Sequence, residues 1–149
     1  MNIFKYTFLW MAILFTAPCL FAQTNNNNEG EIIYLTKKDF LEKVYDYEKN
    51  RESFVYEGTL PCIVDFYADW CAPCRMVDPI LKDLAQEYKG KIIIYKVNID
   101  KEKALASAFG IKSIPTYFFI PVNGDPQASA GAMPRESFVK VVEELLLND

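Results

Sequence analysis

Two cysteines at close spacing, Cys71 and Cys74, are the residues of this sequence best suited to covalent chemistry. Cysteines separated by two residues can close a small disulfide ring. Pro73 between them favours a helix start, so we expect Cys71 at or just before a helix N-terminus. The free N–H groups and the helix dipole there favour a thiolate, lowering the cysteine pKa from about 8.5 toward about 3.5 to 7.5. We therefore predict that Cys71 is the nucleophile and that Cys74 is the resolving thiol.

The segment before this pair, residues 61–67, is dense in β-branched and aromatic residues, which is typical of a strand buried on both faces. Asp65 is anomalous there, because a buried carboxylate is costly unless it is paired or protonated. Either Asp65 is a functional buried acid, or residues 61–67 are not a buried strand. Cys62 lies in the same segment, where a cysteine is expected to be a small, inert core residue.

The wider segment resembles the active-site region of the thioredoxins. It reads VDFYADWCAPC over residues 64–74 and continues as Arg-Met-Val-Asp-Pro-Ile-Leu. The resemblance covers most of residues 31–147, and further family positions fall in register: Asp65, Pro79, Lys96-Val-Asn-Ile-Asp100, Ile114-Pro115-Thr116 and Gly131. It implies the α/β thioredoxin fold, a central mixed β-sheet flanked by helices. It also implies dithiol–disulfide exchange with protein substrates, without a cofactor.

The resemblance also implies roles for individual residues. Asp65 would lie beneath the cysteines and accept the proton of Cys74, directly or through water. Lys96 would modulate this acid by its charge; the alternative is a solvated lysine at a strand end. Ile114-Pro115 resembles the cis-proline loop of the family, whose backbone offers hydrogen bonds to an extended substrate. The implied substrate-binding surface consists of Trp70, Ala72, Pro73, Ile114, Pro115 and Gly131.

Two departures from the family pattern lie close to the cysteines. Ala72-Pro73 replaces the usual Gly-Pro dipeptide, and Asp78 adds an anion one turn beyond Cys74. The dipeptide helps set the stability of the disulfide against the dithiol, and about 30 mV corresponds to a tenfold change in equilibrium. A reductant or isomerase is the preferred interpretation, and a net oxidant that donates its disulfide is the alternative.

The 149 residues are enough for one domain with a short appendage. Hydrophobic periodicity predicts the order β-α-β-α-β-α-β-β-α, with the last strands antiparallel. Thr36 and Asp39 form a capping box before the first helix, Asp100 is expected to cap the third helix, and Gly110 to follow its end. Residues 49–60, which include Phe54 and Tyr56, form an extension relative to short thioredoxins. We interpret it as a packed surface loop, with partner recognition as the alternative.

The N-terminus has the pattern of a secretory signal over residues 1–22, with Lys5 followed by an apolar run to Phe21. Cleavage is expected after Ala22, leaving a polar linker over residues 23–30 and a thioredoxin domain over residues 31–149. An uncleaved anchor is the alternative, although the run is shorter than the about 20 apolar residues of a membrane span. Lipidation at Cys19 is disfavoured by the preceding proline. The expected location is therefore the periplasm, with a lipoprotein or membrane-anchored form as the alternative.

Composition narrows the function further. The formal net charge is −4 and no basic patch appears, so nucleic acid is not an expected partner. The sequence contains no histidine, which excludes a CxxCH haem site, a Cys-His protease and a His-ligated metal. A metal-binding module using Cys71 and Cys74 is the alternative from another class, but zinc normally takes four ligands. The expected partners are disulfide-containing proteins and an upstream thiol–disulfide electron donor, with the chain monomeric and not inserted in a membrane.

Overall fold

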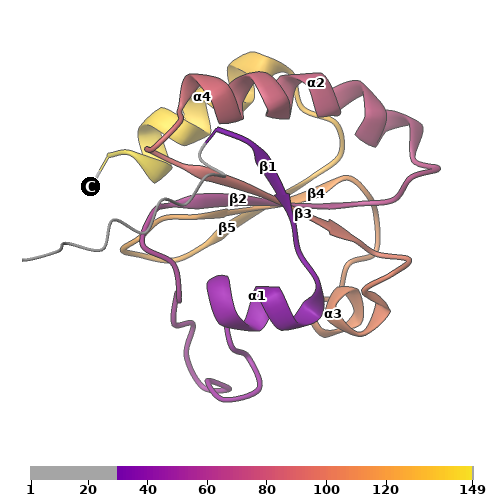
Figure 1. Cartoon of the computed structure of the whole chain (residues 1–149), viewed down its shortest axis with the longest axis vertical. Helices are drawn as coiled ribbons and strands as arrows, with labels where there is room; N and C mark the ends of the chain where they lie inside the picture. The colour runs from indigo at the N-terminus through magenta and orange to yellow at the C-terminus, as the bar shows by residue number, and fades with distance from the viewer. Residues whose placement is uncertain (1–29, 149) are drawn as a thin grey trace, which may run out of the picture.

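The computed structural model describes residues 30–148. The predicted signal, most of the predicted linker and Asp149 lie outside the described residues. The elements, in chain order and drawn in Figure 1, are β1 (Ile32–Tyr34), α1 (Lys37–Lys43), β2 (Cys62–Tyr67), α2 (Ala72–Glu87), β3 (Ile93–Asn98), α3 (Lys103–Ala108), β4 (Thr116–Ile120), β5 (Gln127–Ala130), α4 (Arg135–Val141) and a π-helical turn, Val142–Leu146. This order confirms the predicted succession of strands and helices.

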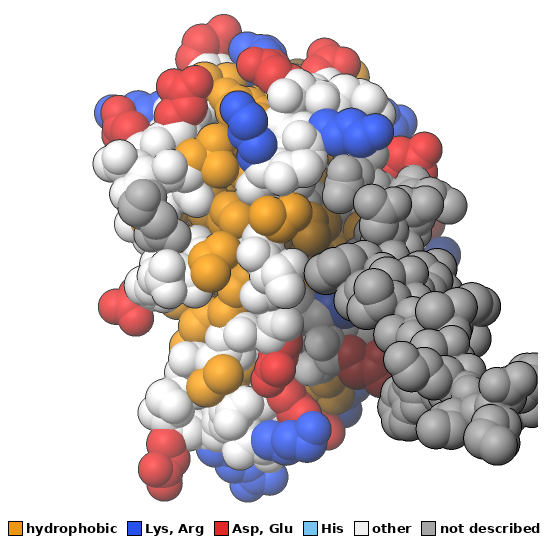
Figure 2. Space-filling view, turned by 60° about the vertical axis from the view of Figure 1, so that its left-hand side comes forward, with side chains coloured by type: hydrophobic (Ala, Val, Ile, Leu, Met, Phe, Trp, Pro, Cys, Tyr) orange, Lys and Arg blue, Asp and Glu red, His pale blue; other side chains and the backbone are white. Residues whose placement is uncertain are grey.

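The strands form one five-stranded mixed sheet in the order β1-β3-β2-β4-β5. The pairs β1·β3 and β2·β3 are parallel, whereas β2·β4 and β4·β5 are antiparallel, as the sequence predicts for the last strands. Helices α2 and α4 cover one face of the sheet, and α1 and α3 cover the other (Figure 1). Figure 2 shows another side of the molecule, on which hydrophobic side chains run down the visible face and charged side chains gather toward the top and the bottom. The fold is therefore a three-layer α/β sandwich.

Strand β2 is buried on both faces, as predicted, and its alternating side chains contribute to two separate cores. Ile63 packs into the core under α2 and α4, together with Leu81, Leu84 and Phe138. Cys62, Val64 and Phe66 point to the opposite face and pack into the core under α1 and α3. Asp65 has the parity of Ile63, so its carboxyl faces the α2 side of the sheet.

The extension over residues 49–60 packs against the α1 side of the sheet. Its two aromatic residues join the core on that face, and the Phe54 ring lies 4.7 Å from the Tyr45 ring between centroids. Tyr56 donates a hydrogen bond of 2.5 Å to the carbonyl of Leu60. These contacts agree with the interpretation of a packed surface loop, and partner recognition by this loop stays a hypothesis.

The helix ends test the capping predictions. The reciprocal hydrogen bonds of Thr36 and Asp39 confirm the capping box of α1. Gly110, with φ of +60°, follows the end of α3 as predicted. The predicted Asp100 cap is wrong, because α3 begins later, at Lys103, and its N-cap Glu102 makes no side-chain capping bond. The Asp100 carboxylate accepts a hydrogen bond from Trp70 instead.

Candidate active site

The redox pair lies at the junction of β2 and α2. Cys71 and Cys74 form a disulfide with an S–S distance of 2.05 Å and a Cα–Cα distance of 5.3 Å. Cys71 is the N-cap of α2, and its Sγ accepts a hydrogen bond of 3.2 Å from the backbone N–H of Cys74. The helix position predicted from Pro73 is therefore confirmed. In the reduced protein the same N–H and the helix dipole would stabilise a thiolate on Cys71.

Most of the exposed side chains beside the disulfide are apolar. Cys71 and Cys74 are almost fully buried, whereas Ala72 and Pro73 between them are exposed. Trp70 immediately precedes the pair and is 66% exposed, and Met76 on the first turns of α2 is 72% exposed. Large exposed hydrophobic side chains beside a reactive disulfide can contact a protein substrate without first being uncovered.

The loop before β4 completes this surface. Ile114 packs against the small cluster that contains Ala68, Cys71 and Cys74. The Ile114-Pro115 peptide bond is cis, as the resemblance implied. The carbonyl of Pro115 accepts a hydrogen bond of 2.8 Å from the N–H of Gly131, which follows β5. Gly131 has φ of +92°, a conformation that favours glycine.

Asp65 is buried beside a lysine. The residue is 1% exposed, and its Oδ2 lies 3.3 Å from Nζ of Lys96 on β3. Its Oδ1 has no hydrogen-bond partner within the described part of the chain. Burial raises the pKa of Asp65 to about 6, although the Lys96 charge opposes the shift. A carboxyl group with this pKa can accept and release a proton near neutral pH, as a base for a cysteine must.

Lys96 is a buried ion-pair residue, so the alternative of a solvated lysine is wrong. The side chain is 3% exposed, and its ammonium group contacts both Asp65 and Asp78. It also lies 4.3 Å from the centroid of the Tyr67 ring, in the geometry of a cation–π contact. Burial opposes the charge, but the hydrogen bond to Asp78 and the charges of both carboxylates raise the pKa of Lys96 above its usual value. Lys96 therefore stays protonated wherever Asp65 titrates.

Lys96 and the inner cysteine, Cys74, line the same open hollow. A hollow of about 200 Å³ is lined by Tyr67, Cys74, Asp78 and Lys96, among others. It lies on the α2 side of the disulfide, whereas Trp70 and Ile114 do not line it. Protons can therefore reach this side of the site without crossing the apolar surface around Trp70.

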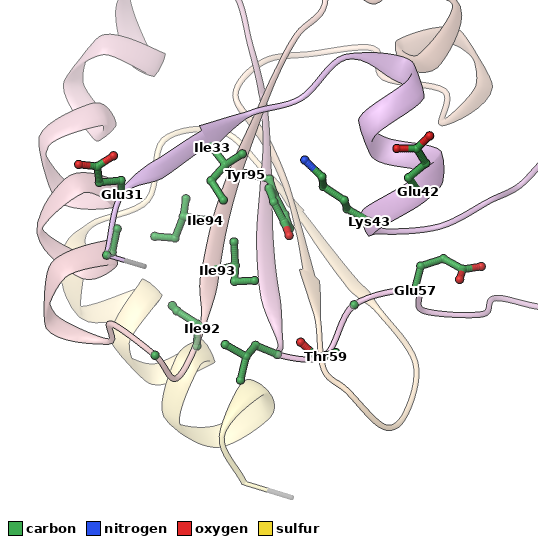
Figure 3. Close-up of a pocket in the computed structure, with 15 residues that line it drawn as sticks. Glu31, Ile33, Glu42, Lys43, Glu57, Thr59, Ile92, Ile93, Ile94 and Tyr95 are labelled. Atoms are coloured by element: carbon green, nitrogen blue, oxygen red, sulfur yellow. The ribbon is translucent and has the colours of Figure 1, made fainter. Parts of the chain in front are cut away.

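Another cavity, of about 340 Å³, lies at the other end of the sheet (Figure 3). Figure 3 shows Ile92, Ile93, Ile94 and Tyr95 lining it, with Lys43 and Glu57 nearby. In the parallel β2·β3 ladder, Cys62 pairs with Ile93 at this end, and Tyr67 pairs with Asn98 at the end near the disulfide. This cavity therefore takes no part in the cysteine chemistry.

Within residues 30–148, no group of three or more Cys, Asp or Glu side chains is arranged to hold a metal ion. Over the same residues, no helix combines the length and the apolar character needed to cross a membrane.

Two contacts of the site were not predicted from the sequence. The sequence marks Asp78 as a departure from the family pattern, but it does not predict the ion pair of Asp78 with Lys96. A signal was available, because Asp78 follows Cys74 by four residues and so lies on the same face of the helix. The hydrogen bond of Trp70 to Asp100 is the second contact, and the sequence gives no signal for it because the local pattern around Asp100 favours a helix cap.

Comparison with known proteins identifies the family. The sequence model described as Thioredoxin matches residues 31–144. A thioredoxin of Borreliella burgdorferi is 44% identical over 112 residues, covering 75% of this chain and 95% of that protein. Thioredoxin 1 of a Nostoc species is 40% identical over 92 residues, covering 62% of this chain and 86% of its own. Among solved structures, a mutant thioredoxin from Halobacterium salinarum NRC-1 matches with a TM-score of 0.61 and 25% identity, covering 78% of this chain and 91% of its own. This chain therefore belongs to the thioredoxin family, and it is a thioredoxin-fold protein-disulfide reductase whose redox pair is Cys71 and Cys74.

Proposed function

We propose that this chain is an exported thioredoxin that works in the periplasm as a reductant or isomerase of protein disulfides. The proposed thiol–disulfide exchange rests on the placement of Cys71 at the N-cap of α2, with the buried Asp65–Lys96 pair on the α2 side of the sheet. The substrates are disulfide-containing proteins, and a separate thiol–disulfide donor returns the oxidised pair to the dithiol.

In the forward reaction the thiolate of Cys71 attacks one sulfur of the substrate disulfide. A mixed disulfide forms, and the first substrate sulfur leaves as a thiolate. Asp65 then accepts the proton of Cys74, and the new thiolate attacks Sγ of Cys71. This step releases the second substrate thiolate and closes the Cys71–Cys74 disulfide. The substrate gains two electrons and the protein loses two.

The apolar surface supports a protein substrate. Trp70, Ala72 and Pro73 are exposed at the disulfide, and the Ile114-Pro115 loop lies beside it. An extended substrate segment can bury its side chains against Trp70 and pair its backbone with the loop. A small disulfide reagent would use little of this surface, so a comparison of protein disulfides with small disulfides separates docking from chemistry.

Support for export comes from the N-terminal sequence. Lys5 and the apolar run that follows have the pattern of a signal, and the match to the family begins only at residue 31. The test is fractionation of the source cells, followed by mass determination of the mature chain. A periplasmic chain that begins near Gln23 and needs no detergent is expected. Recovery only in membranes would favour the anchored or lipidated form, and a full-length cytoplasmic chain would contradict export.

The reduction potential decides between reductant and oxidant. After equilibration with glutathione buffers, we expect a reduction potential that is closer to the thioredoxin value of about −270 mV than to the value of about −120 mV for a strong dithiol oxidase. A value near the upper figure would make the net oxidant the better description. Zinc binding is tested on the same reduced sample; tight stoichiometric binding with loss of reductase activity would favour a metal module.

A further inference from the structure

The ammonium group of Lys96 is shared between two carboxylates that differ sharply in exposure. On one side it lies 3.3 Å from Asp65, whose side chain is 2% exposed. On the other side it forms a close ion pair with Asp78 of α2, whose side chain is 28% exposed. Asp78 also lies 3.3 Å from Nζ of Lys82, which is 61% exposed. Charges of alternating sign therefore run from the buried acid to solvent: Asp65, Lys96, Asp78, Lys82.

The position of the lysine matters because it alters the basicity of Asp65. A lysine paired with Asp65 alone would strongly favour the ionised carboxylate and make it a poor proton acceptor. Asp78 provides a second partner and places a further negative charge near Asp65. Both effects disfavour the ionised form of Asp65. Asp65 therefore binds a proton more tightly than it would if Lys96 were paired with Asp65 alone.

We propose that Asp78 is a positioning residue, which holds Lys96 between two carboxylates and thereby keeps Asp65 basic enough to accept the proton of Cys74. Asp78 itself touches no reacting sulfur in this role. The proton moves from the Cys74 thiol to Asp65, and the thiolate that remains attacks Sγ of Cys71 in the mixed disulfide. The inference rests on the role proposed above for Asp65 and adds the residue that tunes it.

The other groups that face Asp65 do not account for the same effect. Tyr117 of β4 is the cross-strand neighbour of Asp65, and burial raises the pKa of its phenol, so it stays neutral. Lys96 of β3 carries a positive charge, which lowers the pKa of Asp65. Of the charged groups acting on Asp65, Asp78 is the one that raises this pKa, adding to the larger effect of burial.

The test is a direct titration of the Asp65 carboxyl by carbon NMR in the oxidised protein, in which neither cysteine titrates. Asp78→Asn removes the charge with little change in shape. We expect the pKa of Asp65 to fall by about half a unit or more. Asp78→Glu should retain a value close to wild type. Asp83→Asn is the matched control, because Asp83 is an exposed aspartate of the same helix and should leave the titration unchanged.

The corresponding kinetic test measures, as a function of pH, the rate at which a preformed mixed disulfide is resolved. The acid limb is the part of this profile in which the rate falls as Asp65 becomes protonated. In Asp78→Asn the acid limb should move to lower pH together with the NMR titration, whereas a purely structural role for Asp78 would lower the rate at every pH. Asp78→Ala gives the same comparison if the asparagine variant is poorly folded.

An unchanged pKa of Asp65 in a folded Asp78→Asn variant would overturn the inference. Failure of the base assignment has a different signature. Asp78→Asn would then still shift the NMR titration of Asp65, but the acid limb would stay in place both in Asp78→Asn and in Asp65→Asn.

Discussion

The indole Nε1 of Trp70 donates a hydrogen bond of 2.8 Å to the carboxylate of Asp100, thirty positions further along the chain. Trp70 adjoins the nucleophilic cysteine, and Asp100 lies in the loop between β3 and α3. The Asn98 side chain in turn accepts a hydrogen bond of 2.9 Å from the N–H of Asp100. An exposed tryptophan is therefore held in one orientation before any substrate arrives, which lowers the entropy cost of docking.

Removal of this hydrogen bond should weaken protein substrates selectively. For Asp100→Ala we expect KM for a protein disulfide to rise about two- to tenfold, the effect of about 0.5–1.5 kcal/mol. The rate with a small aromatic disulfide should stay near wild type. Steady-state reduction of both substrates measures the difference, with the exposed Asp125→Ala as a control. Equal losses on the two substrates would place Asp100 in the chemistry and not in docking.

The two cysteines should differ in what their variants accumulate. Cys71→Ser should abolish turnover, because the N-cap thiolate makes the first attack. Cys74→Ser should retain that attack and trap mixed disulfides, which nonreducing gels and mass spectrometry detect. Comparable trapping by both variants would mean that the nucleophile and the resolving thiol are not distinguished by their helix positions.

Asp65 should lower stability at neutral pH. Its pKa in the folded protein, about 6, is above the ordinary value of 3.8, so the folded state binds the proton more tightly than the unfolded state does. The contribution of Asp65 to wild-type stability is therefore most favourable below about pH 4, and it is lost as the pH rises through about 6. Asp65→Asn removes this dependence, and it should be more stable than wild type by about 1–3 kcal/mol at pH 7.

Denaturant unfolding of the oxidised protein at pH 4 and pH 7 measures this difference, and Asp83→Asn should follow wild type at both values. The same Asp65→Asn variant should release mixed disulfides more slowly. A variant that is no more stable at pH 7 and resolves as fast as wild type would show that Asp65 is not the base.

Cys62 should be dispensable for the redox cycle. It is fully buried in β2, and burial raises the pKa of its thiol to about 12, so little thiolate forms at neutral pH. Cys62→Val is close in volume and should change stability by less than about 1.5 kcal/mol. Insulin reduction should stay near wild type. A large loss of activity in a folded variant would make Cys62 a third redox group.

The sequence alone determined the features that depend on neighbours along the chain. Pro73 and the cysteine spacing placed Cys71 at a helix N-terminus, because proline favours the first turn of a helix. The β-branched and aromatic pattern identified the buried strand around Asp65. Successive side chains of a strand point to opposite faces of the sheet, so a strand buried on both faces is apolar at successive positions. The family resemblance, not periodicity, supplied the cis bond at Pro115 and the pairing of Asp65 with Lys96.

Only the tertiary structure decided how distant polar groups meet. Asp65 and Lys96 are partners in the parallel β2·β3 register, and the packing of α2 over that face brings Asp78 to the same ammonium group. Asp100 is a case in which the local sequence predicts the wrong partner. Its neighbours along the chain favour a helix cap, but the fold brings the Trp70 indole within reach of its carboxylate. A polar side chain takes the partner that packing places beside it, and the sequence specifies that packing only through the whole fold.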